Sequence, residues 1–266
     1  LAPKNSDPKN DIFIDYNIVS CLKCGCLQLS NLVDLNVLYR EQHYESNWVG
    51  QKKQFEIFSN MIIQEINDKP VKIIEVGAGS GKFAKILKNK QSNIDYTILD
   101  ICPDNPNIED ISFINANCEN YDFPSDSMVV ASHMFEHLYT PHKFVKNLSK
   151  NNVRDVFIII PNQRAQIKHK IHPVIYHEHT YLVEKDDIAY IFGEHNYYIH
   201  NFEEYDIHAL ILHFKLSNTT IINVLKPKFN RYNIKEVFEE KRDKVKNLIL
   251  DKSFYIIPAS HSGMLI

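Results

Sequence analysis

The middle of the chain contains short, continuous apolar runs that alternate with amphipathic stretches. Continuous apolar runs of this length are typical of strands that are buried on both faces. Five of them follow one another, at 71–76, 95–100, 111–116, 128–133 and 155–161. Because helical stretches separate them, we predict an α/β fold with a doubly wound, mostly parallel sheet that helices cover on both faces.

The amphipathic stretches predict the helices and the edge of this sheet. Three helices are expected at 51–67, 81–90 and 184–195, and a fourth begins after Thr140 with Pro141 at its first position. Two further strand-like runs, 197–203 and 207–217, come after the last helix. We expect them to pair antiparallel at one edge of the sheet.

The same pattern divides the chain into three parts. Residues 1–48 form a small N-terminal region that contains cysteines, and residues 49–220 form the main domain. Residues 221–266 contain a charged connecting helix at 233–250 and a strand at 253–260 that begins a partial C-terminal α/β unit. The chain begins with Leu and ends on an apolar run, so we expect the whole protein to extend beyond both ends.

Composition excludes several classes of protein. The net charge of −3 argues against a general nucleic-acid binder. No apolar run approaches the roughly 20 residues that span a bilayer, and no apolar core of a secretion signal opens the chain. Five cysteines, an odd number, do not indicate a disulfide framework, which favours the cytoplasm. The composition does not indicate an oligomeric state.

A glycine-rich segment, "IIEVGAGSGKF", connects the first strand of the sheet to the helix that follows. Gly77, Gly79 and Gly81 let backbone N–H groups and a helix N-terminus approach a ligand closely. Asp100 ends the next strand, 19 residues after Gly81, where a carboxylate can accept hydrogen bonds from two ribose hydroxyls. NAD enzymes use a similar turn, and a tight turn without a ligand would also need glycines.

Two further segments favour one family. "E-V-G-x-G-x-G", "ASHMFEHLYTPHKFV" after the fourth strand and "PN" after the fifth resemble class I S-adenosylmethionine-dependent methyltransferases, in the same order. The resemblance implies a Rossmann-like fold and S-adenosylmethionine as cofactor. The residues that it assigns to the cofactor are Glu75, Gly77, Gly79 and Gly81 at the amino-acid end, Asp100 at the ribose, Asn117 and Cys118 at the adenine, and His133.

Two cysteines near the N-terminus have the spacing of metal ligands. Cys21 and Cys24, in "CLKCGCLQL", can occupy two corners of a tetrahedral zinc site. A single CxxC pair is also common without a metal. From the residues alone, both interpretations stay open.

The segment "YHEH" concentrates groups that transfer protons. Tyr176, His177, Glu178 and His179 come after the fifth strand, and ligands of open α/β sheets bind beyond the carboxyl ends of the strands. The cluster can therefore face a cofactor held by the glycine turn. A polar surface loop with ordinary hydrogen bonds is the alternative.

A closer resemblance covers most of residues 12–205. "VSCLKCGCLQLSNLVDLNVLYREQHYESNW" and "IYHEHTYLVEKDDIAYIFGEHNYYI" resemble sugar C-methyltransferases. The resemblance implies that His179 removes a proton next to a keto group, that Tyr176 and Glu178 position the sugar or the base, and that Tyr44 closes over the sugar. It also implies a structural zinc ion, for which Cys21 and Cys24 would form the second of two cysteine pairs.

We therefore expect a methyltransferase that methylates carbon of a nucleotide-linked keto-deoxysugar through an enolate. The chain departs from the family where a His-Gly-Gly segment is usual, because Ala209 and Leu210 follow His208. Two alternatives stay open. One is an O- or N-methyltransferase that acts on a surface carbohydrate, as in polysaccharide biosynthesis, or on a small phosphorylated acceptor. The other is a binding module without catalysis.

Overall fold

The computed structural model describes residues 14–39, 49–66, 70–169 and 178–221, together with Val224, Glu239 and Asp243. Four expectations lie outside the described residues. They concern Tyr44, Tyr176, the strand at 253–260 and all but Glu239 and Asp243 of the helix at 233–250.

Within the described residues, seven strands form one large sheet in the order β5-β4-β3-β6-β7-β10-β9. Their bounds are β3 Val71–Val76, β4 Ile94–Asp100, β5 Ile111–Asn115, β6 Ser127–Ser132, β7 Asp155–Pro161, β9 Tyr197–Tyr205 and β10 Ala209–Leu216. Strands β3 to β7 run parallel, whereas β10 pairs antiparallel with both β7 and β9. The predicted parallel sheet and its antiparallel edge pair are both confirmed.

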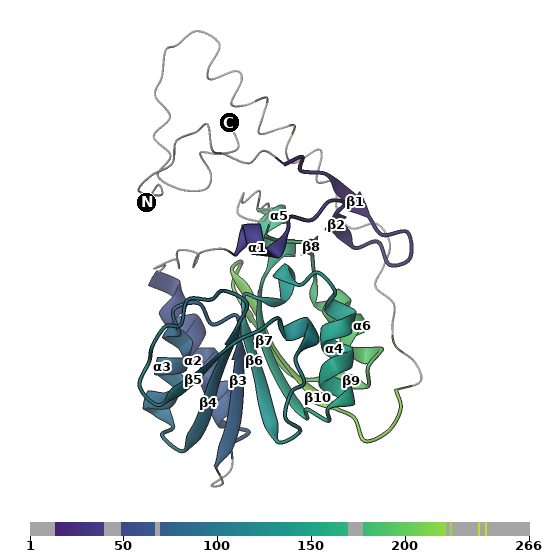
Figure 1. Ribbon diagram of the computed structural model, residues 1–266. Helices are drawn as coiled ribbons and strands as arrows, with labels where there is room; N and C mark the ends of the chain where they lie inside the picture. The colour runs from purple at the N-terminus through teal and green to yellow at the C-terminus, as the bar shows by residue number, and fades with distance from the viewer. Residues whose placement is uncertain are drawn as a thin grey trace, which may run out of the picture.

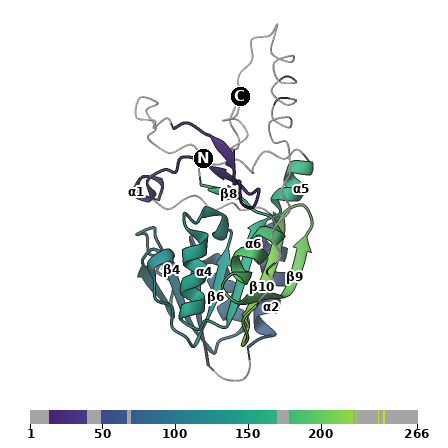
Figure 2. The same ribbon diagram turned by 90° about the vertical axis from the view of Figure 1, so that its right-hand side faces the viewer.

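Helices cover both faces of this sheet (Figures 1 and 2). One face packs against α2 (Val49–Ile63) and α3 (Lys82–Lys90), and the other against α4 (Pro141–Lys150) and α6 (Lys185–Gly193). Successive side chains of a strand point to opposite faces, and β7 shows it. Its Val156, Ile158 and Ile160 join the α4–α6 core, while Phe157 and Ile159 join the α2–α3 core.

Local chemistry explains where two of the helices begin. Pro141 occupies the first turn of α4, as predicted. The side chain of Thr140 makes no capping bond there, and its backbone N–H instead donates to the Glu119 carboxylate. Helix α6 begins with a capping box, in which Glu184 and Asp187 each accept from the other's backbone N–H.

A second, small sheet lies beyond the carboxyl ends of the parallel strands (Figure 1). In the described residues it consists of β1 (Ile18–Ser20), β2 (Leu27–Leu29) and β8 (Tyr181–Leu182). Strands β1 and β2 form a hairpin, and β2 pairs with β8 from much later in the chain. This pairing brings the N-terminal region and the segment after "YHEH" together beyond the carboxyl ends of the parallel strands.

Two short helices lie at the same end of the large sheet. Helix α1 (Leu35–Leu38) follows the hairpin, and α5 (Gln163–Lys168) follows β7, where the Asn162 side chain caps its first turn. None of the helices in the described part of the chain combines the length and the apolar character that a membrane span requires.

Candidate functional site

The turn between β3 and α3 has a backbone that glycine adopts readily. Gly77, Gly79 and Gly81 have φ angles of +67°, +55° and +70°, where other residues are strained. A Cβ atom on Gly77 would also lie 2.6 Å from Cγ of Met134. Gly77 and Gly79 line a cavity, and Gly81 is not among the described residues that line it. A Cβ atom on Gly81 would lie 2.3 Å from Cδ1 of Ile108, so the close packing there also suits glycine.

Two carboxylates border the cavity beside this turn. Glu75 near the end of β3 is buried and accepts a hydrogen bond of 2.7 Å from the Tyr96 hydroxyl. Burial and the Glu75 charge both raise the pKa of Tyr96, so the phenol stays a donor. Asp100 at the end of β4 accepts from the backbone N–H groups of Cys102 at 2.9 Å and Gly79 at 3.3 Å. These two donors orient the Asp100 carboxylate at the cavity wall.

Asn117 and Cys118 are the residues that the resemblance assigns to the adenine. Both line the cavity, next to the end of β5. The Asn117 side chain caps a short 3₁₀ helix, η2 (Cys118–Asn120), by accepting from the N–H of Glu119 at 2.9 Å. Burial raises the pKa of the Cys118 thiol, so the thiol stays protonated.

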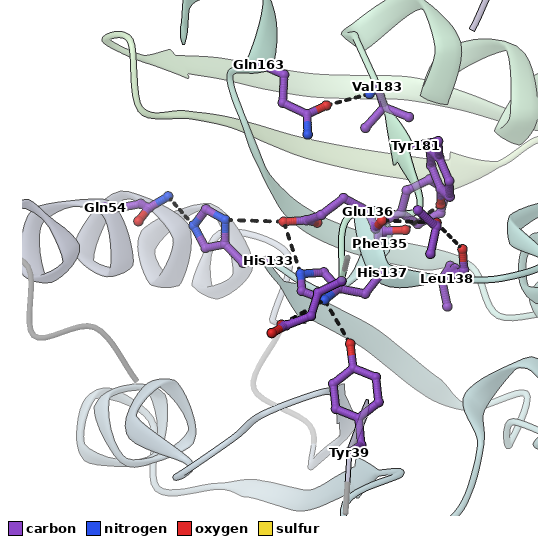
Figure 3. Close-up of polar contacts among 12 residues, drawn as sticks. Tyr39, Gln54, His133, Phe135, Glu136, His137, Leu138, Gln163, Tyr181 and Val183 are labelled. Atoms are coloured by element: carbon purple, nitrogen blue, oxygen red, sulfur yellow. Dashed lines mark hydrogen bonds and ion pairs between the residues drawn. The ribbon is translucent and has the colours of Figure 1, made fainter. Parts of the chain in front are cut away.

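The segment after β6 carries the second methyltransferase signature. His133 has a φ of +52° and donates its backbone N–H to Ile159 at 2.8 Å. Its Nε2 lies 3.0 Å from the Gln54 amide nitrogen of α2. Glu136 is the middle residue of the short 3₁₀ helix η3 (Phe135–His137) and has no exposed surface. Figure 3 shows its carboxylate between the rings of His133 and His137, with Nδ1 of His133 at 3.7 Å and Nε2 of His137 at 3.8 Å.

His137 connects this signature to the "YHEH" segment. Its Nδ1 lies 2.9 Å from the Tyr39 hydroxyl and 3.7 Å from a Glu178 carboxylate oxygen. The His179 ring meets the His137 ring edge-on, with centroids 5.1 Å apart. Burial, followed by the Glu178 charge, raises the pKa of Tyr39, so its hydroxyl stays protonated. The arrangement joins imidazoles, carboxylates and a phenol in one cluster.

The cavity has a volume of about 710 Å³, which is within the usual range for small-molecule sites. One part of its wall is formed by the glycine turn together with Glu75 and Asp100. The rest includes Tyr39, Gln54, His133, His137, Glu178, Gln166 and His208. His179 is buried and is not among the described residues that line the cavity; His137, which it contacts, is.

Sequence reasoning therefore found part of this wall. It gave no role to Tyr39, Gln54 or His137. His137 stands inside the quoted "FEH" signature, which was the available signal, whereas nothing in the sequence marks Gln54. His208 lines the cavity, but Ala209 and Leu210 are buried in the two cores, so these replacements of glycine do not reshape the described cavity wall.

The two N-terminal cysteines lie at the turn of the β1–β2 hairpin. Backbone hydrogen bonds from Cys24 and Lys23 lower the pKa of Cys21, while burial raises that of Cys24. Two thiols in one tight turn suit half of a tetrahedral zinc site. In the part of the chain that is described, neither thiol belongs to a group of three closely spaced His, Cys, Asp or Glu ligands. The described residues thus provide two ligands and no more.

A comparison with protein families decides the affiliation of the chain. A family model described as a methyltransferase domain matches residues 52–201. The chain belongs to this family. The matched methyltransferase domain runs from α2 to β9 and contains the glycine turn, both carboxylates and the "FEH" signature. No curated protein matches the sequence.

Solved structures agree with the methyltransferase domain in fold. A magnesium protoporphyrin IX methyltransferase from Synechocystis PCC 6803, with bound S-adenosylhomocysteine, is 14% identical with a TM-score of 0.52, covering 66% of this chain and 90% of its own. The N-methyltransferase NodS from Bradyrhizobium japonicum WM9, in complex with S-adenosylhomocysteine, is 11% identical with a TM-score of 0.51, covering 69% and 98%. At these identities, the likeness establishes the Rossmann-like methyltransferase fold and not the acceptor.

Proposed function

We propose that this methyltransferase uses S-adenosylmethionine to methylate carbon of a nucleotide-linked keto-deoxysugar. The observation that carries the proposal is the acid–base cluster of Tyr39, His137, Glu178 and His179, of which the first three line the same cavity as the glycine turn and His179 contacts His137. Methyl transfer to oxygen or nitrogen needs at most one base. A cluster of this size suits the harder removal of a proton from carbon.

The glycine turn and its carboxylates fit the cofactor. Backbone N–H groups near a helix N-terminus bind a carboxylate, and Asp100 is placed to accept hydrogen bonds from ribose hydroxyls. The buried charge of Glu75 suits the ammonium group of the amino-acid end. Bound there, S-adenosylmethionine supplies an electrophilic methyl group on a positively charged sulfur.

The protein's own work is proton removal and orientation. A C–H bond next to a ketone is a weak acid, and a positioned imidazole can remove its proton near neutral pH. His179 is the base that the resemblance implies, and it acts together with His137, whose ring borders the cavity. The enolate oxygen needs a hydrogen-bond donor, which the protonated Tyr39 hydroxyl supplies. Tyr176 and Tyr44 are further candidates for positioning the sugar.

A panel of keto-sugar nucleotides, incubated with cofactor that carries a labelled methyl group, tests the proposal. Mass spectrometry should find the label on carbon of one panel member. His179→Ala should lower turnover by about 10² to 10⁴-fold, as for the loss of a general base, and should leave cofactor affinity within about threefold. An equal loss of cofactor affinity would show that His179 is structural.

A second candidate is O- or N-methylation of a surface carbohydrate or a small phosphorylated acceptor. The observation that favours it is the fold shared with the N-methyltransferase NodS. A hydroxyl or amine acceptor would use the imidazoles as a base without an enolate. Capsule-type acceptors should therefore run beside the sugar nucleotides, and label on oxygen or nitrogen would favour this candidate.

A further inference from the structure

Glu136 is a buried carboxylate for which the proposed chemistry has no use so far. Its side chain has no exposed surface, and neither of its oxygens has a hydrogen-bond partner among the described residues. A buried charge without compensation strongly destabilises a folded protein. Positively charged or polar side chains near Glu136 are therefore needed to compensate its charge.

Three imidazoles surround this carboxylate, two from its own segment and one from much later in the chain. His133 comes from the end of β6, His137 from η3 and His179 from the segment before β8. The first two approach one oxygen at 3.7 and 3.8 Å, and the nitrogens of His137 and His179 lie within 4.8 Å of it and of each other. These distances exceed a direct hydrogen bond, so the interaction is one of charge.

Charge also sets the protonation state of Glu136. Burial by itself would raise the pKa of this carboxyl, but the polar contact with the His133 ring, followed by the charges of His137, His133 and His179, lowers it below its usual value. Among the described residues, the phenols of Tyr181 and Tyr39 also lie in its field, and burial keeps them protonated. Glu136 is therefore an anion beside imidazoles that can take up a proton.

The orientation of His137 matches this role. Its Nδ1 faces the Tyr39 hydroxyl at 2.9 Å and Glu178 at 3.7 Å, so its Nε2 faces Glu136. The carboxylate of Glu178 is partly exposed at the cavity, and that of Glu136 is enclosed. The two carboxylates thus address different nitrogens of the same ring.

We propose that Glu136 is a positioning residue whose carboxylate stabilises the proton that the imidazole pair His137 and His179 removes from the acceptor. The C–H electron pair would stay on the acceptor carbon and then form the bond to the methyl group, whose bond to the cofactor sulfur would break with its electron pair left on sulfur. The proton stays on an imidazole nitrogen. With Glu136 present, that transfer neutralises a buried anion. Without it, only the partly exposed Glu178 would lie beside the imidazole cation, so the same transfer would be less favourable. This inference rests on the proposed function.

Glu136→Gln tests the idea, because the amide keeps the shape and removes the charge. In protein with isotope-labelled histidine, NMR titration should show the His179 midpoint about one to three pH units lower than in the wild type. The matched control is Glu65→Gln. Glu65 lies 3.4 Å from His200 and 3.8 Å from His213, away from the described cavity wall, so its loss should leave the His179 midpoint unchanged.

Turnover gives the second readout. Glu136→Gln should lower kcat by about 10- to 100-fold, less than the loss of a general base, with KM nearly unchanged and the acidic limb of the pH profile displaced. Glu136→Asp keeps the charge and should recover part of kcat. If Glu136→Gln fails to bind S-adenosylhomocysteine or loses its near-UV circular dichroism, Glu136→Asp provides the comparison instead.

The outcomes separate this inference from the proposed function. A displaced His179 midpoint, in an enzyme that methylates oxygen or nitrogen and not carbon, would keep the charge role of Glu136 and refute C-methylation. An unchanged midpoint in a folded variant would overturn the role of Glu136. Binding of one equivalent of Zn²⁺ that Glu136→Gln abolishes would also overturn it, since the carboxylate would then bind a metal.

Discussion

Replacing Asp100 by Asn removes the charge that the proposed ribose site depends on. The Asp100 carboxylate is held by the N–H groups of Cys102 and Gly79, so it is already oriented before a ligand binds. Hydrogen bonds to a charged group contribute about 1.5 to 3 kcal/mol. Since 1.4 kcal/mol is a factor of ten in affinity, the dissociation constant for S-adenosylhomocysteine should rise by about 10- to 150-fold.

Isothermal titration calorimetry measures this change directly. Asp95→Asn is the matched control, because Asp95 is exposed on the same strand and does not line the cavity. Its affinity should stay within about twofold of the wild type. If Asp100→Asn keeps its unfolding midpoint and binds within threefold of the wild type, the ribose site has been misplaced.

Three further predictions concern stability and metal content. Gly77→Ala should lower the free energy of unfolding by about 2 to 5 kcal/mol, because of the positive φ and the clash with Met134. Adding Met134→Ala should recover part of this loss, as measured by urea unfolding, and no recovery would contradict the clash. Burial, followed by the nearby His142, lowers the pKa of His195. The unfolded chain therefore takes up this proton first, and His195 opposes folding as pH falls below about 6.5. The drop in urea midpoint from pH 7.5 to 5.5 should be smaller in His195→Asn, and equal drops in the two proteins would refute this role of His195. Full-length protein should contain one zinc ion that requires Cys21 and Cys24, and fewer than about 0.2 equivalents after gentle purification would argue against it.

The large sheet could be predicted because its strands are marked along the chain. Strands buried on both faces read as continuous apolar runs, and β7 with Val156 to Ile160 is the clearest case. The glycines with positive φ and the carboxylate that ends β4 could also be predicted, because few residue types suit those positions. The sequence could therefore predict the part of the cavity around the glycine turn, where we propose that the cofactor binds.

The acceptor half depends on contacts between distant parts of the chain. Strand β8 has two residues and pairs with β2 from the N-terminal hairpin, and no periodic pattern marks a strand of that length. That pairing accompanies the meeting of Tyr39, His137 and Glu178, which come from three separate segments. The sequence shows Glu136 only as part of a signature, because its burial follows from the packing of η3 against β7 and β8.

Deuterium exchange tests the central claim most directly. The acceptor that the enzyme methylates should be incubated in D₂O with S-adenosylhomocysteine, which has no methyl group to transfer. We predict that deuterium enters at the carbon next to the keto group, and that His179→Ala slows this entry by about 10²-fold or more. No exchange in an acceptor that the wild-type enzyme does methylate would contradict removal of a proton from carbon.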